Sequence, residues 1–118
     1  MIAVGGHYLD PLPELLVRAS CPFGGGIGGS YDELCGVLSG GVIVLGALWG
    51  RASSAENDEW VRELARQYQA RFVAYAGTST CRPIRDSMPE QERRCLPVVL
   101  EGARLLVEII AKARQEAP

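Results

Sequence analysis

The chain has 118 residues, of which 47% are hydrophobic and 22% are charged, and its formal net charge is −2. This length and balance suit a single folded domain over residues 1–118 and exclude a disordered tail. The acidic and basic residues are mixed, without the basic stripe that nucleic-acid binding requires, so we expect no nucleic-acid partner.

The sequence carries no sign of export or of membrane insertion. Its first residues lack the basic run, the apolar segment and the cleavage site of a signal peptide. Residues 34–49 carry no charge, but this stretch is shorter than the roughly 20 residues that span a bilayer. We therefore expect a cytoplasmic protein without a membrane span.

Helical signals dominate the first half of the chain. The first predicted helix, residues 12–20, begins among prolines, which are tolerated in a first helical turn. A glycine-rich loop, residues 24–29, separates it from a second predicted helix, residues 31–49. Ser30 and Glu33 have the spacing of a capping box that would start this second helix. Its glycines each cost about 1 kcal/mol relative to alanine, so close packing should compensate.

The second half continues the helical pattern. A third predicted helix covers residues 54–75 and should end at Gly77. A short helix is predicted from Cys81 to about Asp86, and the last helix from Pro89 onward, with a kink at Pro97. Its predicted inward stripe is Leu96, Val99, Leu100, Ala103, Leu106, Val107 and Ile110. The predicted fold is all-α, a compact bundle of about four helices with the Gly-rich second helix buried.

The glycine loop formally satisfies the pattern G-x-G-x-x-G through Gly24, Gly26 and Gly29. That fingerprint binds dinucleotides only after a strand and within a βαβ unit, which this helical context does not provide. The loop can instead hold an anion or let a cofactor approach its backbone, or it can simply allow a tight helix crossing. The candidate residues for such backbone approach are Gly24, Gly25, Gly26, Gly28, Gly36 and Gly40.

The four cysteines are the best indication of function. In a small cytosolic protein they favour metal, cluster or redox use over structural disulfides. No C-x-x-C pair occurs, which removes thioredoxin-like dithiols and zinc knuckles as local motifs. The one histidine, His7, is expected at the surface and gives no Cys/His hydrolase.

Three of the thiols lie near predicted helix starts, and two of them, Cys81 and Cys95, have arginines close by. Helix dipoles should favour the thiolates of Cys35 and Cys81, and Arg82 and Arg85 should lower the pKa of Cys81 further. Cys95 follows a pair of arginines. The residues expected around the thiols are Arg82, Arg93 and Arg94. Each cysteine alone could be a small buried hydrophobic residue, but three together favour thiol chemistry.

Residues 23–110 resemble a family of redox-active proteins named for the cysteine pattern C_GCAxxG_C_C. Val37 stands where the family usually has alanine. The resemblance implies an all-helical redox or metal-cluster protein of prokaryotes, and a related module occurs in a cytochrome with an iron–sulfur centre. The matching segments are Phe23-Gly24-Gly25-Gly26-Ile27-Gly28, Cys35-Gly36-Val37-Leu38-Ser39-Gly40, Leu45-Gly46, Trp49-Gly50, Cys81-Arg82 and Cys95.

Family members usually carry a further cysteine in a helix well upstream of the glycine loop, which these 118 residues do not include; Cys21 brings the number to four. The predicted function is a redox-active protein in which Cys35, Cys81 and Cys95, with Cys21 as a fourth ligand, bind an iron–sulfur cluster or a metal for electron transfer. The alternatives are a cofactor-free thiol–disulfide protein and a structural zinc site or helical interaction module. The redox partner, any enzymatic activity and homodimer formation stay open.

Overall fold

The structure, a computed structural model, describes residues 1–117. These residues form helices and no β-strand, which confirms the predicted all-helical class. They contain six α-helices rather than about four, of which α3, α4 and α6 are long. The elements are α1 (Ile2–Tyr8), α2 (Glu14–Ser20), the 3-10 turn η1 (Cys21–Phe23), α3 (Gly36–Trp49), α4 (Glu59–Ala76), α5 (Cys81–Asp86) and α6 (Leu96–Glu116).

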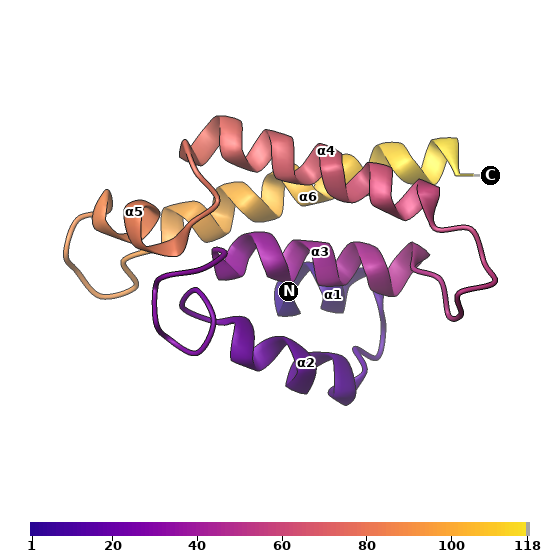
Figure 1. Ribbon diagram of the computed structural model, residues 1–118, viewed down its shortest axis with the longest axis horizontal. Coiled ribbons are helices and arrows are strands. Elements are labelled where there is room, and N and C mark those ends of the chain that lie inside the picture. The colour runs from indigo at the N-terminus through magenta and orange to yellow at the C-terminus, as the bar shows by residue number, and fades with distance from the viewer. Residues whose placement is uncertain (118) are drawn as a thin grey trace.

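The three long helices enclose the hydrophobic core. Helices α4 and α6 run side by side along one flank of α3, and α2 lies along the opposite flank (Figure 1). Tyr68 and Phe72 of α4 pack with Val44 and Leu45 of α3 and Ile110 of α6, and all five side chains are almost completely buried. Each such side chain contributes about 1.5–3 kcal/mol when it leaves water, so this seam holds the fold together.

The Gly-rich helix α3 is shorter and less buried than the sequence predicts. It starts at Gly36 because Tyr31–Leu34 run as a non-helical segment, and the Ser30 hydroxyl donates to Gly26 O instead of capping the helix. One face of α3 is buried, whereas Val42 lies on an exposed face. Complete burial of this helix is therefore not confirmed.

The start and the inward face of α6 also differ from the prediction. Residues 87–95 form turns, and α6 begins at Leu96 with Pro97 in its first turn, where the missing N–H is not needed, so no interior kink arises. The buried face is rotated relative to the predicted stripe, and Val99, Leu100 and Val107 are exposed. The buried residues of α6 are Val98, Gly102, Leu105, Leu106, Ile109, Ile110 and Ala113.

The N-terminal helix α1 was not predicted. Its seven residues include two glycines, so local propensity does not favour a helix. Tertiary packing holds it in place, because Val4 is buried against the core and the Arg114 guanidinium of α6 lies 4.7 Å from the centre of the Tyr8 ring. His7 is exposed, as expected, although it belongs to this helix.

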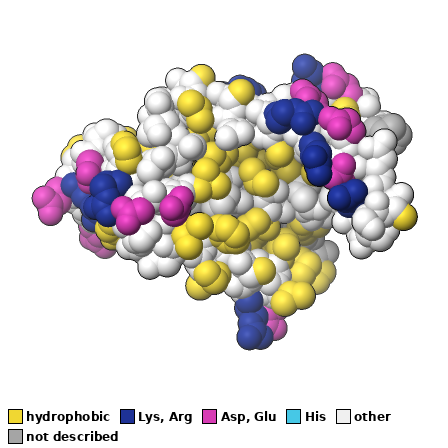
Figure 2. All heavy atoms as spheres, viewed as in Figure 1, with side chains coloured by type: hydrophobic (Ala, Val, Ile, Leu, Met, Phe, Trp, Pro, Cys, Tyr) yellow, Lys and Arg dark blue, Asp and Glu magenta, His cyan; other side chains and the backbone are white. Residues whose placement is uncertain are grey.

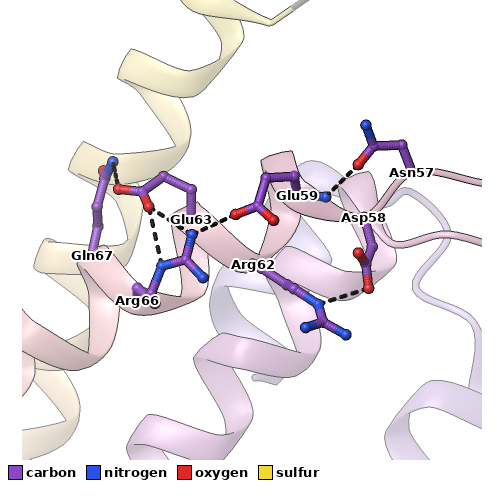
Figure 3. A network of polar contacts seen from close by, with 7 residues as sticks. All are labelled: Asn57, Asp58, Glu59, Arg62, Glu63, Arg66 and Gln67. Atoms are coloured by element: carbon purple, nitrogen blue, oxygen red, sulfur yellow. Dashed lines mark hydrogen bonds and ion pairs between the residues drawn. The ribbon is translucent and has the colours of Figure 1, made fainter.

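The charged residues lie at the surface. The first turns of α4 carry an exposed network of ion pairs and hydrogen bonds among Asn57, Asp58, Glu59, Arg62, Glu63, Arg66 and Gln67 (Figure 3). Such exposed pairs contribute little stability, about 0–1 kcal/mol each. Hydrophobic side chains gather across the middle of the face that shows α2 and α3 (Figure 2). Among the described residues, no helix combines the length and apolarity needed to cross a membrane.

Val37, which stands where the resembled family usually has alanine, lies in close contact with Gly102 of α6. A Cβ atom added to Gly102 would lie 2.2 Å from Val37 Cγ1, far inside van der Waals contact. We expect Gly102→Ala to lower the free energy of unfolding by about 1–3 kcal/mol through overpacking. In a Val37→Ala background the same change should be nearly neutral, giving a coupling of about 0.5–3 kcal/mol in a urea-denaturation double-mutant cycle.

Gly46→Ala is the matched control for this cycle. Gly46 also lies in a helix but has open space around it, so alanine should stabilise the protein by up to about 1 kcal/mol through helix propensity. Strictly additive effects of Val37→Ala and Gly102→Ala would contradict the proposed contact.

Candidate functional site

The glycine loop forms a short left-handed segment. Gly25, Gly26, Gly28 and Gly29 have φ angles of +62° to +71°, and Ile27 between them has a φ of +68°. This conformation costs an ordinary residue roughly 1–2 kcal/mol and costs glycine almost nothing, which explains the glycines. The loop therefore reverses the chain tightly between η1 and the segment that precedes α3.

Backbone hydrogen bonds join this segment to the start of α5. The Cys81 N–H donates to Glu33 O, and the Cys35 N–H donates to Ser79 O, each at 2.8 Å. An isolated antiparallel bridge pairs Leu34 with Thr80 between these two bonds. Cys35 and Cys81, which are 46 residues apart in the sequence, are thereby held beside each other by main-chain contacts.

Each of the three predicted thiols sits where a helix begins. Cys35 is the N-cap residue of α3, Cys81 is the first residue of α5, and Cys95 is the N-cap residue of α6. Cys21 opens the short turn η1 just before the glycine loop. Cys35 and Cys81 are buried, Cys95 is partly buried and Cys21 is exposed, and all four thiols are free.

All four cysteines line one cavity of about 440 Å³. The cavity lies among α1, α3, α6 and the glycine loop, and its other walls are mainly apolar side chains and glycine backbone. The α1 side of the wall is formed by a helix that the sequence did not predict. A volume of this size is typical of small-molecule sites.

Burial opposes ionisation of the two innermost thiols. It raises the pKa of Cys35, an effect that Cys95 strengthens and that the N–H groups of Val37 and Leu38 oppose. Burial is also the main cause of the raised pKa of Cys81; Cys35 and Cys95 add to it, and Arg85 and Arg82 act against it. The prediction that helix dipoles and arginines lower these pKa values is wrong, because desolvation outweighs them.

The arginines near the thiols have different roles. Arg82 is not among the residues that line the cavity; it binds Asp32 (2.9 Å) and the Ser30 carbonyl (2.8 Å), which fastens α5 to the segment that follows the glycine loop. Arg85 lies over the Tyr31 ring, 4.4 Å from its centre, and lines the cavity.

The other two predicted arginines lie outside the cavity wall. Arg93 and Arg94 belong to the turns before α6, and Arg93 has a φ of +54°. The Arg94 Nε is buried without a hydrogen-bond partner within residues 1–117.

The predicted glycines fall into three groups. Gly24, Gly25, Gly36 and Gly40 line the cavity. A Cβ on Gly26 would lie 2.7 Å from Cys81 Cβ, so this glycine allows Cys81 to approach the loop. Gly28 has open space around it, so glycine is favoured there only because the backbone is left-handed.

Much of the cavity wall escaped the sequence-based site prediction, including Tyr31, Tyr68 and Arg85. Tyr68 has the helical spacing of a core residue, and it is buried. Its hydroxyl donates to Gly102 O (3.1 Å), which no local pattern indicates. Tyr31 and Arg85 are more than fifty residues apart, so their stacking has no signal in the sequence.

The four thiols do not form a compact site for a single metal ion in the part of the chain that the structure describes. Within residues 1–117, no three Cys, His, Asp or Glu side chains converge closely enough to bind one ion. Cluster ligands attach to different iron atoms and need not meet at one point. Thiolates are the usual ligands of such clusters, so the chemistry of the four thiols is compatible with one.

Comparison with known proteins identifies the family. The family model described as "Putative redox-active protein (C_GCAxxG_C_C)" matches residues 1–109. The chain belongs to the C_GCAxxG_C_C family. No curated protein and no solved structure matches it. In this C_GCAxxG_C_C protein the CGxxxG hexapeptide marks the start of α3, and it includes Cys35 and two of the cavity glycines.

The contact between the loop and Cys81 can be tested with two glycine substitutions. Gly26→Ala and Gly28→Ala should both introduce left-handed strain of about 1–2 kcal/mol, since their φ angles are +65° and +62°. Only Gly26→Ala also collides with Cys81, so it should lower the urea unfolding free energy further and speed alkylation of Cys81 by iodoacetamide. Equal effects of the two substitutions would contradict the contact.

Alkaline titration tests the burial of Tyr68. Burial raises the pKa of Tyr68 from 10.0 to about 12. Its contribution to stability is thus fully present below about pH 10 and is lost as the pH rises through about 12. We expect the wild-type unfolding free energy to fall more steeply over this window than that of Tyr68→Phe. Parallel pH profiles would contradict this expectation.

Proposed function

We propose that this protein holds an iron–sulfur cluster and transfers electrons through it. Cys35, Cys81 and Cys95 are the proposed ligands, with Cys21 as the fourth. The observation that carries the proposal is that four thiols from three helix starts and a turn line one cavity. A bound cluster would supply one-electron chemistry, which suits the redox description of the family.

The surroundings of the thiols support a cluster. Cys35 and Cys81 are only 7% and 8% exposed, so the polypeptide shields this end of the cavity from water. Exclusion of water and nearby hydrogen-bond donors are the means by which proteins set the potential of a cluster. Iron would also replace the protons of buried thiols, since a coordinating thiol is deprotonated.

A disulfide between Cys35 and Cys81 is less well supported. The bridge between Leu34 and Thr80 puts Cys35 opposite Ser79, so Cys35 and Cys81 occupy diagonal positions of the pair. Diagonal positions are about 7–8 Å apart, whereas Cα atoms of a disulfide are usually about 4.4–6.8 Å apart. A disulfide between these two cysteines would thus require movement of the backbone. We place the protein in the cytoplasm, where thiols stay reduced.

Anaerobic purification and reconstitution with iron and sulfide test the proposal. We expect a coloured protein that absorbs between roughly 300 and 450 nm and contains iron and sulfide in equal amounts. Cys35→Ser, Cys81→Ser and Cys95→Ser should each abolish the absorption. Cys21→Ser should weaken cluster retention without preventing folding, because Cys21 is exposed.

Circular dichroism and thermal unfolding of each variant serve as the control for folding. A colourless wild-type chain without iron after reconstitution would refute the cluster. Zinc in the purified protein would instead favour a structural metal, and a reversible disulfide of Cys35 would favour thiol–disulfide exchange.

A further inference from the structure

We propose that the cavity beside the cysteines binds a small, mostly apolar organic anion, with its charged group at Arg85. Such a molecule would be the substrate of the redox centre, and its role as a substrate rests on the proposed function. Binding itself is a separate property and can be measured without iron.

The cavity is large enough and apolar enough for such a molecule. Its volume of about 440 Å³ lies within the range of about 300–1,000 Å³ that small-molecule sites occupy. Away from the thiols, Val4 of α1, Val37 of α3 and Leu106 of α6 supply the walls. These side chains favour an apolar ligand body by the hydrophobic effect.

Glycine backbone forms part of the wall and leaves space there. A Cβ atom on Gly36 would meet its nearest neighbour, Phe23 O, at 3.5 Å, which is ordinary contact. Packing between protein segments thus does not require glycine at position 36. The absence of a side chain there keeps the cavity wide at the end that holds Cys35.

Arg85 determines the expected charge of the ligand. It is the one charged side chain in the described cavity wall, which includes no carboxylate. Within residues 1–117, its guanidinium makes a single ion pair, a 4.0 Å contact with Asp86 that is too long for a hydrogen bond. Arg82, by comparison, is saturated by Asp32 and the Ser30 carbonyl.

An arginine with free donors in an apolar wall is best satisfied by an anion. The desolvation cost of a cation falls when a hydrogen-bonded opposite charge is present, and guanidinium groups bind carboxylates and sulfonate-like anions strongly. A cationic or strongly polar ligand would gain nothing from these walls.

Two fluorescent probes with the same aromatic frame test the proposal. The anionic probe is 8-anilinonaphthalene-1-sulfonate, and the uncharged probe is N-phenyl-1-naphthylamine. We expect the wild-type protein to bind both. Arg85→Gln should lower the affinity for the anionic probe on the order of tenfold and leave the affinity for the uncharged probe nearly unchanged. Arg85→Lys should recover part of the lost affinity for the anionic probe.

A pair of alanine substitutions on α6 tests the location. Ala103 lines the cavity, whereas Ala111 lies exposed on the same helix. Ala103→Leu should fill part of the cavity and lower the affinity for both probes. Ala111→Leu should leave both affinities unchanged. Unchanged circular dichroism and thermal midpoints establish that the probes are not binding to a loosened fold.

Equal loss of both probes in Arg85→Gln, or equal binding by Ala103→Leu and Ala111→Leu, would overturn the proposal. So would an Arg85→Gln protein that loses iron but keeps its preference for the anionic probe, because Arg85 would then serve the cluster. Titrations on iron-free and reconstituted protein separate the two proposals. Selective probe binding by a chain that takes up no iron would refute only the cluster, and iron uptake without probe binding would refute only the ligand site.

Discussion

Main-chain pairing between residues 31–35 and 79–82 is the constraint on which the site depends. Three hydrogen bonds of 2.8 Å, donated by the N–H groups of Cys35, Cys81 and Arg82, connect the segment before α3 with the start of α5. Backbone bonds fix relative position more firmly than flexible side chains do. They bring two thiols together before any ligand is present, and they dock α5 against the glycine loop. The ion pair of Arg82 with Asp32 strengthens the same junction at its exposed side.

The glycine loop makes this pairing geometrically possible. A left-handed segment turns the chain within a few residues, and residues 31–34 leave the loop as a non-helical segment. Removal of the Cβ at Gly26 then lets Cys81 settle against the loop. The glycines thus serve two purposes in one short segment: they allow the left-handed backbone, and Gly26 lets Cys81 approach it closely. In a phosphate-binding loop of similar sequence, the glycines instead let the backbone approach a phosphate group.

The opposition between burial and charge connects the architecture to the proposed chemistry. Helix starts favour negative charge, and three cysteines occupy such starts, yet desolvation raises the pKa of Cys35 and Cys81. A buried group of thiols that resists ionisation in water becomes a strong donor set once a metal cluster replaces the protons. Arg85 lies in the wall of the same cavity, where it would face a molecule bound beside the proposed centre.

The amino-acid sequence was enough to predict the helical class, the end of α4 at Gly77 and the short helix from Cys81 to Asp86, because these follow from local periodicity and from caps. It could not determine that Arg85 lines the cavity, that α1 is a helix or that α6 buries a rotated face. These features depend on contacts between distant segments, such as Tyr31 with Arg85 and Val37 with Gly102. Which thiols share a cavity could be known only from the folded chain, because burial and proximity are properties of its packing and not of its local pattern.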